Sequence, residues 1–176
     1  MKIRKGFISN SSSSSFIIAL KEKPKSAKDL QNILFGEKDY FFIDDPNCPA
    51  FITPFSLTSK DAARIIFKDL KKPASMKEIK EELRGGTLYS KDIPENLRYP
   101  KCPRYEENED LREKKEKEYD KKVNIYIEEV LKHFLQKTKN LKYFIVEYSD
   151  NDGALEAVLE HEGTFNKINH IQVSKH

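Results

Sequence analysis

The order of apolar and polar residues along the chain predicts strands at both ends and helices between them. Phe7 and Ile8 precede a run of serines, and the apolar residues 16–20 follow it, so a first pair of strands is expected over residues 3–20. Residues 143–148 are β-branched and aromatic, a pattern typical of strands. Residues 169–174 are expected to form the final strand.

A hairpin turn is predicted where Asp150, Asn151, Asp152 and Gly153 follow one another, because these residue types tolerate the positive φ angles of tight turns. Residues 154–160 are expected to form the return strand. The last third of the chain therefore favours antiparallel pairing.

Three short helices are predicted by their amino-terminal capping residues. In each case a serine or threonine is followed three residues later by an acid, the pattern that satisfies the first free N–H groups of a helix. The pairs are Ser26 with Asp29, Thr58 with Asp61, and Ser75 with Glu78. The helix faces expected to be buried comprise Leu30, Ile33 and Leu34, then Ala62, Ile65, Ile66 and Leu70, then Met76, Ile79 and Leu83.

One long helix is predicted over residues 106–139. Its first half, residues 106–122, contains eight acids and six bases, whereas its second half carries an apolar stripe. The stripe comprises Val123, Ile127, Val130, Leu131, Phe134 and Leu135. Residues 87–105 contain three prolines and are expected to form a loop excursion before this helix.

These elements together predict an α+β fold in a single domain spanning residues 1–176. Its antiparallel sheet would unite the amino-terminal and carboxy-terminal strands, with three short helices and one long charged and amphipathic helix between them. Tryptophan is absent, so the 11 Phe and 8 Tyr residues must supply the bulky packing.

Composition narrows the range of partners. The formal net charge is only +3, and acids outnumber bases in the charged half of the long helix, so nucleic acid is not an expected partner. No apolar run is long enough for a membrane span or a signal peptide, so a soluble cytoplasmic protein is expected. Cys48 and Cys102 each precede a proline and lack metal-ligand spacing, which favours two free thiols.

The five consecutive serines are the first candidate site. Ser11, Ser12, Ser13, Ser14 and Ser15 would form a loop between two strands, in which hydroxyl and backbone N–H groups could cradle a small anion. The basic residues Lys2, Arg4 and Lys5 are close in sequence. The serines lack the Gly-Lys-Ser/Thr ending of a phosphate-binding P-loop, and a structural role within a tight crossing is the alternative.

The carboxy-terminal segment supplies the second set of candidate residues, which comprises Asp150, Asp152, Glu160, His161 and His176. Residues 143–164 carry six acids and no lysine or arginine. An EF-hand is excluded, because aligning Gly153 with its glycine places Tyr148 and Leu159 at ligand positions. No metal site is expected from spacing alone. A serine nucleophile paired with His161, His170 or His176 lacks a Gly-x-Ser-x-Gly setting.

Both ends of the chain carry a distinctive motif. The opening motif is Gly6-Phe7-Ile8-Ser9-Asn10 followed by the five serines and Phe16. The closing motif combines Tyr148-Ser149-Asp150, Gly153, Leu159-Glu160-His161 and His176. With these two motifs the chain resembles a group of uncharacterised small proteins from bacteria and their phages. This resemblance implies a phage or prophage context and couples the two ends of the chain. It implies no activity and no functional residue.

The expected function is therefore that of a small phage-type accessory protein. It would bind a phosphorylated or nucleotide-like ligand, or a segment of a partner protein, where the serines meet the acids and histidines. One alternative is a host- or virion-interaction protein without a pocket, which would use the charged half of the long helix. Another is a metal-dependent hydrolase built on the same acids and histidines. The sequence indicates no particular cofactor or oligomeric state.

Overall fold

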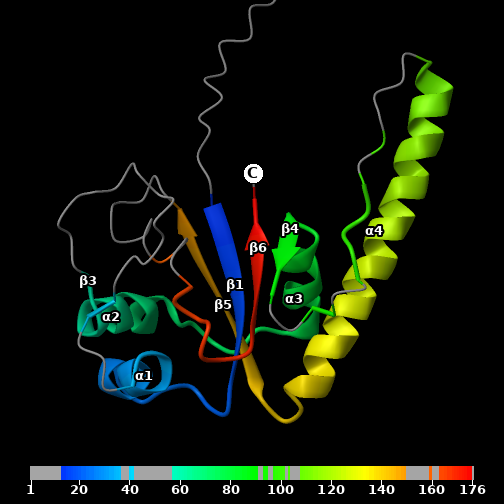
Figure 1. The fold of residues 1–176 in the computed structure, drawn as a ribbon. Coiled ribbons are helices and arrows are strands. Elements are labelled where there is room, and N and C mark those ends of the chain that lie inside the picture. Colours follow the sequence, from blue (N-terminus) through cyan, green and yellow to red (C-terminus); the bar gives the residue numbers. More distant parts are fainter. Residues whose placement is uncertain are drawn as a thin grey trace, which may run out of the picture.

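A four-stranded antiparallel sheet lies at the centre of the protein (Figure 1). The computed structural model describes residues 13–36, 40–41, 57–90, 93–94, 97–101, 103, 108–149, 159 and 163–175. In these residues the strand order is β4-β6-β1-β5, and the strands are β1 (Ser13–Leu20), β4 (Thr87–Tyr89), β5 (Lys142–Ser149) and β6 (His170–Ser174). A second, two-stranded sheet pairs β2 (Tyr40–Phe41) with β3 (Leu57–Thr58). The predicted α+β class is confirmed.

Strand β1 lies between the two carboxy-terminal strands, and the predicted antiparallel sheet of amino-terminal and carboxy-terminal strands is confirmed. Phe16 lies opposite Val146 of β5 on one side and opposite Gln172 of β6 on the other. The run from Phe16 to Leu20 is apolar at every position because both faces of this strand are covered. Successive residues point to opposite faces, so Phe16, Ile18 and Leu20 enter one core and Ile17 and Ala19 enter the other.

One face of the sheet is covered by α1 (Ala27–Leu34) and α2 (Ser59–Asp69), and the other by α3 (Met76–Leu83) and α4 (Glu109–Lys137) (Figure 1). The first core is filled by side chains such as Leu30, Ile66, Phe144 and Phe165. The second contains Ile79, Leu83, Ile127, Val130 and Phe134, among others. The sheet therefore separates two apolar layers.

All three predicted helix starts are confirmed. The side chains of Ser26, Thr58 and Ser75 accept hydrogen bonds from the N–H groups of Asp29, Asp61 and Glu78, respectively. Ser75 and Glu78 form a reciprocal capping box, in which the carboxylate of Glu78 accepts from the N–H of Ser75 at 2.7 Å. These hydrogen bonds, with the N–H of Ser75 first, lower the pKa of the exposed Glu78 carboxyl.

The long helix is confirmed within its predicted range. Its second half packs through Tyr126, Ile127, Val130, Leu131 and Phe134, whereas its first half has no buried residue and extends beyond the sheet (Figure 1). No helix in the described part of the chain has the length and apolar character needed to cross a membrane.

The predicted loop over residues 87–105 is wrong at its start, because Thr87–Tyr89 form β4 and pair with β6. Only Leu88 of this strand points into the core, and a strand of three residues is too short for its apolar and polar positions to be recognised in the sequence.

Gly86 allows the backbone of β4 to approach β6 closely. A methyl group added to Gly86 would overlap the carbonyl oxygen of Ser174 and stand 2.7 Å from its carbonyl carbon.

Two predicted core positions lie at the surface. Ile33 and Met76 remain about two-fifths exposed, because each lies at the border of the apolar face of its helix. A third difference concerns Leu159, the one described residue of the predicted return strand 154–160. It is fully buried but has helical backbone geometry.

Candidate functional site

The described serines belong to the central strand rather than to a loop. Ser13 lies opposite Ser149, Ser14 opposite Tyr148 and Ser174, and Ser15 opposite Glu147 and Val173. The main-chain groups of Ser14 and Ser15 are therefore committed to pairing within the sheet. The predicted backbone cradle for an anion is wrong for Ser13–Ser15, because main-chain pairing with β5 and β6 carries β1 through these serines. Ser11 and Ser12 lie outside the described residues.

The serine hydroxyls point to both faces of the sheet. Ser14 is buried on the side of α1 and α2, where its Oγ accepts a hydrogen bond from Nε2 of Gln172 at 3.1 Å. Ser15 faces the side of α3 and α4 and is fully buried. Its Oγ has no hydrogen-bond partner among the described residues. Leaving a buried hydroxyl unpaired costs about 1–3 kcal/mol, so this position is not optimised for stability.

Lys175 joins three elements beside these serines. Its Nζ lies 2.7 Å from Oε1 of Glu82 at the end of α3 and 2.9 Å from Oε1 of Glu147 on β5. Its main-chain N–H donates to the carbonyl oxygen of Ser13 at 2.9 Å. We use the name polar end for this part of the sheet, which comprises Ser13–Ser15, Glu147–Ser149, Ser174 and Lys175 with Glu82 beside it.

The ionised side chains at the polar end carry a net negative charge. Burial alone would lower the pKa of the Lys175 ammonium, but hydrogen bonds to Glu82 and Glu147 favour its charged form and raise the pKa above the ordinary value of 10.5. Two carboxylates thus surround one ammonium, giving these three side chains a net charge of −1. A phosphate would meet no uncompensated cation among them.

The Lys175 ion pairs predict a specific dependence of stability on pH. Because the pKa is raised by folding, their contribution is fully present below pH 10.5 and is lost as the pH rises through the folded-state value. We expect Lys175→Met to lower the melting temperature by about 2 °C at neutral pH, and this difference to narrow above about pH 10.5. Melting curves measured between about pH 7 and 11.5 check it.

The control for this measurement is Lys77→Met, which removes an exposed ion pair with Glu81. We expect this variant to melt close to the parent protein at every pH, because exposed pairs contribute little. A Lys175→Met protein that melts with the parent at neutral pH would contradict a stabilising role for the three-residue ion pair.

His170 has a structural role. It is buried, its Nδ1 lies 3.2 Å from the carbonyl oxygen of Ile168, and its own carbonyl oxygen accepts from Oγ of Ser90 at 2.6 Å. Its ring centroid lies 6.4 Å from that of Phe16 and 6.2 Å from that of Phe165. These contacts place the imidazole beside the aromatic rings of the first apolar core.

The remaining candidate residues, Asp150, Asp152, Glu160, His161 and His176, lie outside the described residues, as do Cys48 and Cys102. They stay predictions. Their neighbours in sequence are nevertheless placed, since Ser149 precedes Asp150, Lys175 precedes His176, and both flank β1 at the polar end. In the described ranges, no three His, Cys, Asp or Glu side chains gather as metal ligands would.

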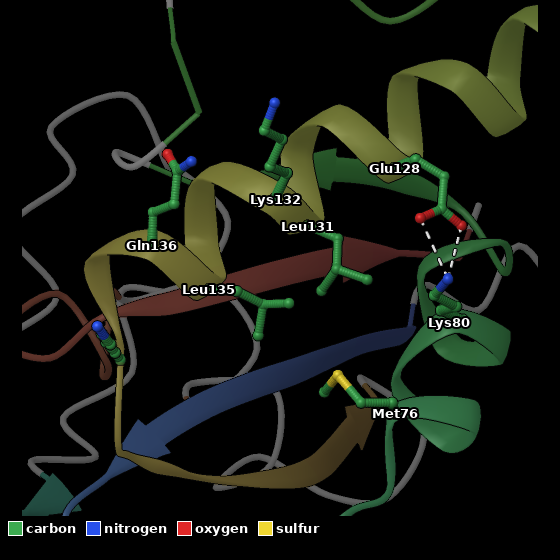
Figure 2. Close-up of a pocket in the computed structure, with 8 residues that line it drawn as sticks. Met76, Lys80, Glu128, Leu131, Lys132, Leu135 and Gln136 are labelled. Carbon is green, nitrogen blue, oxygen red and sulfur yellow. Dashed lines mark hydrogen bonds and ion pairs between the residues drawn. The ribbon is translucent and has the colours of Figure 1, made fainter.

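A groove that the sequence does not predict lies between α3 and α4 (Figure 2). It has a volume of about 670 Å³, and Met76, Leu131 and Leu135 provide its apolar surface. Nζ of Lys80 lies 2.8 and 3.1 Å from the two carboxylate oxygens of Glu128 and spans one end (Figure 2). The sequence gives little sign of this groove, because the spacing of Met76 and Leu135 predicts that both side chains lie in the core.

Comparisons with known proteins place this chain in no group. No family model matches it, and neither the curated proteins nor the solved structures contain a match.

Proposed function

We propose that this protein is a small accessory protein of the cytoplasm, of phage or prophage type, that binds an extended, basic segment of a partner protein beside the polar end of its sheet. The observation that carries this proposal is the outer edge of β5, which runs to the polar end and where the main-chain groups of Ile145 and Glu147 have no partner among the described residues. Adding a strand to such an edge is a common way of binding peptides.

The direction of the main-chain groups on β5 supports this mode of binding. The carbonyl oxygen of Tyr143 accepts from the N–H of Ala74, so it points away from β1. Groups on a strand alternate in direction, so Ile145 and Glu147 also present their N–H and C=O groups to the outer side. Neither residue has a main-chain partner there among the described residues.

Charge favours a basic segment over a phosphorylated ligand. The three ionised side chains at the polar end carry a net charge of −1. Besides Glu147, the sequence over residues 143–164 contains five further acids and no lysine or arginine, all five outside the described residues. A partner strand carrying lysine or arginine on alternate positions would complement these acids, whereas a phosphate would be repelled. The phage-type motifs at both ends of the sequence support the accessory role.

The test uses a variant that removes one outward donor. In Glu147→Pro the N–H that faces solvent is lost, and the pairing of β5 with β1 is retained because the donors of neighbouring even-numbered residues are unchanged. Fluorescence anisotropy would measure binding of a labelled peptide with alternating lysine and valine. We expect saturable binding that Glu147→Pro weakens at least about 10-fold and Glu147→Gln weakens less.

An acidic peptide with alternating glutamate and valine is the matched probe and is expected not to bind. Binding of the basic peptide that is equal in the parent protein and in Glu147→Pro would contradict pairing at this edge. So would the absence of binding. Thermal stabilisation by ATP or inorganic phosphate would instead favour the small anionic ligand.

A further inference from the structure

We propose that a second copy of this chain docks on the outer face of α4, with the two α4 helices antiparallel. This self-association surface consists of Ile125, Glu128, Lys132 and Leu135 of α4 together with Met76 of α3. It lies on the face of the sheet covered by α3 and α4, and the proposal does not depend on peptide binding at β5.

The self-association surface exposes large apolar side chains. Ile125 is 61% exposed, the largest value for a large apolar side chain in the described residues, and Met76 is 39% exposed. The groove that contains Met76 and Leu135 continues into a second depression beside Ile125, because Glu128 and Lys132 line both. A protruding aliphatic side chain and an apolar hollow therefore lie on one continuous face.

The arrangement of residues along α4 fits a two-fold axis. In an antiparallel pair of identical helices, a residue before the midpoint faces the residue equally far beyond it on the other copy. With the midpoint at Val130, Ile125 faces Leu135 of the second copy. The same midpoint pairs Glu128 with Lys132. It also pairs Asn124 with Gln136, and all six residues line the two hollows.

Each of these pairs occurs twice in the dimer, which makes the surface self-complementary in both shape and charge. Glu128 already binds Lys80 of its own copy (Figure 2). Lys132 of the second copy would approach the same carboxylate from the open side, where only solvent screens the charges. No external partner is needed to supply either the protruding aliphatic side chain or the opposite charge.

The expected association is weak. The same midpoint places Lys121 opposite Lys139, which lies just past the end of α4, so a like-charge pair stands at each end of the contact. The helical stretch from Lys121 to Lys137 is roughly 24 Å long, which by itself buries less area than a standard dimer interface. We therefore expect a dissociation constant of about 10–100 µM.

Sedimentation velocity on the full chain tests the proposal directly. The parent protein is expected to change from 20.6 kDa at low micromolar concentration toward twice that mass above about 100 µM. Ile125→Asp should weaken the association at least about 10-fold, because it places two charges against apolar surfaces. Leu111→Asp is the matched control. Leu111 is also exposed on α4 but lies outside the contact, so no change is expected.

Charge reversal supplies a second, independent arm. Glu128→Lys and Lys132→Glu should each weaken the dimer about 10-fold, whereas the protein carrying both reversals should regain most of the affinity because the pairing is restored with exchanged signs. Circular dichroism would confirm that every variant is folded. A parent protein that stays at 20.6 kDa above about 100 µM overturns the proposal. A dimer unaffected by Ile125→Asp, or not rescued by the double reversal, overturns it equally.

Discussion

Replacing Gly86 with alanine is expected to destabilise the protein by about 3 kcal/mol or more, although it adds a single methyl group. Gly86 lies where the chain leaves α3 and enters β4, and its Cα faces the main chain of β6. The added carbon would overlap the carbonyl oxygen of Ser174 and lie 3.3 Å from the nitrogen of Lys175. A backbone atom cannot turn aside as a side chain can, so β4 and β6 must separate.

Chemical denaturation monitored by circular dichroism measures this effect. Gly85→Ala is the adjacent control, because its methyl group would lie 3.1 Å from the carbonyl oxygen of Glu82 and 3.6 Å from a flexible carbon of Lys175. We expect a loss below about 1 kcal/mol for this control. If both variants unfold at the denaturant concentration of the parent protein, the close approach of Gly86 to β6 is wrong.

Phe134→Ala is expected to cost about 3–5 kcal/mol, which is a large part of the stability of a domain this size. Phe134 is 1% exposed, and its ring lies 5.8 Å from that of Tyr143 on β5. It belongs to the half of α4 that anchors the helix to the sheet, whereas residues 109–122 contribute no buried side chain. Removing the ring leaves a cavity between helix and sheet that neighbouring side chains only partly refill.

The control is Ile125→Ala, two and a half turns earlier on the same helix. Because Ile125 is largely exposed, its truncation should change the free energy of unfolding by less than about 0.5 kcal/mol at low protein concentration. Equal destabilisation by the two substitutions would contradict the assignment of the two faces of α4.

The helices could be predicted because their signals are local. Ser26, Thr58 and Ser75 each predict the start of a helix, because each can accept a hydrogen bond from the N–H group three residues later. All three of these hydrogen bonds are present in the structure. The apolar residues 16–20 likewise predict a strand buried on both faces, since no solvated face interrupts them. In these segments the residues that decide the structure are close together in sequence.

The structure differs from the sequence-based predictions where residues far apart in the sequence determine the local conformation. Strand β4 exists because β6 offers a free edge to Thr87–Tyr89, and nothing within residues 87–105 reports that edge. The serines form part of β1 for the same reason, because pairing with β5 and β6 outweighs their usual preference for turns. Strand propensity is easily overridden by such tertiary pairing.

For the candidate site, the sequence correctly predicted that the two ends of the chain meet in one sheet. It did not predict the ammonium of Lys175 between Glu82 and Glu147, because these residues come from three separate elements. The consequence is chemical. The hydroxyl-rich segment that suggests an anion has two carboxylates as neighbours, which is why we propose a basic strand rather than a phosphate as the ligand.

The position of β1 between β5 and β6 also constrains how the protein is made. On the ribosome, the apolar stretch from Phe16 to Leu20 emerges long before Val146 and Gln172, its partners on either side. At about 5–20 residues per second, the nascent chain carries this stretch without its complete sheet for roughly 8–30 s. Slower translation should therefore lengthen the time during which this apolar stretch is open to capture by chaperones or to aggregation.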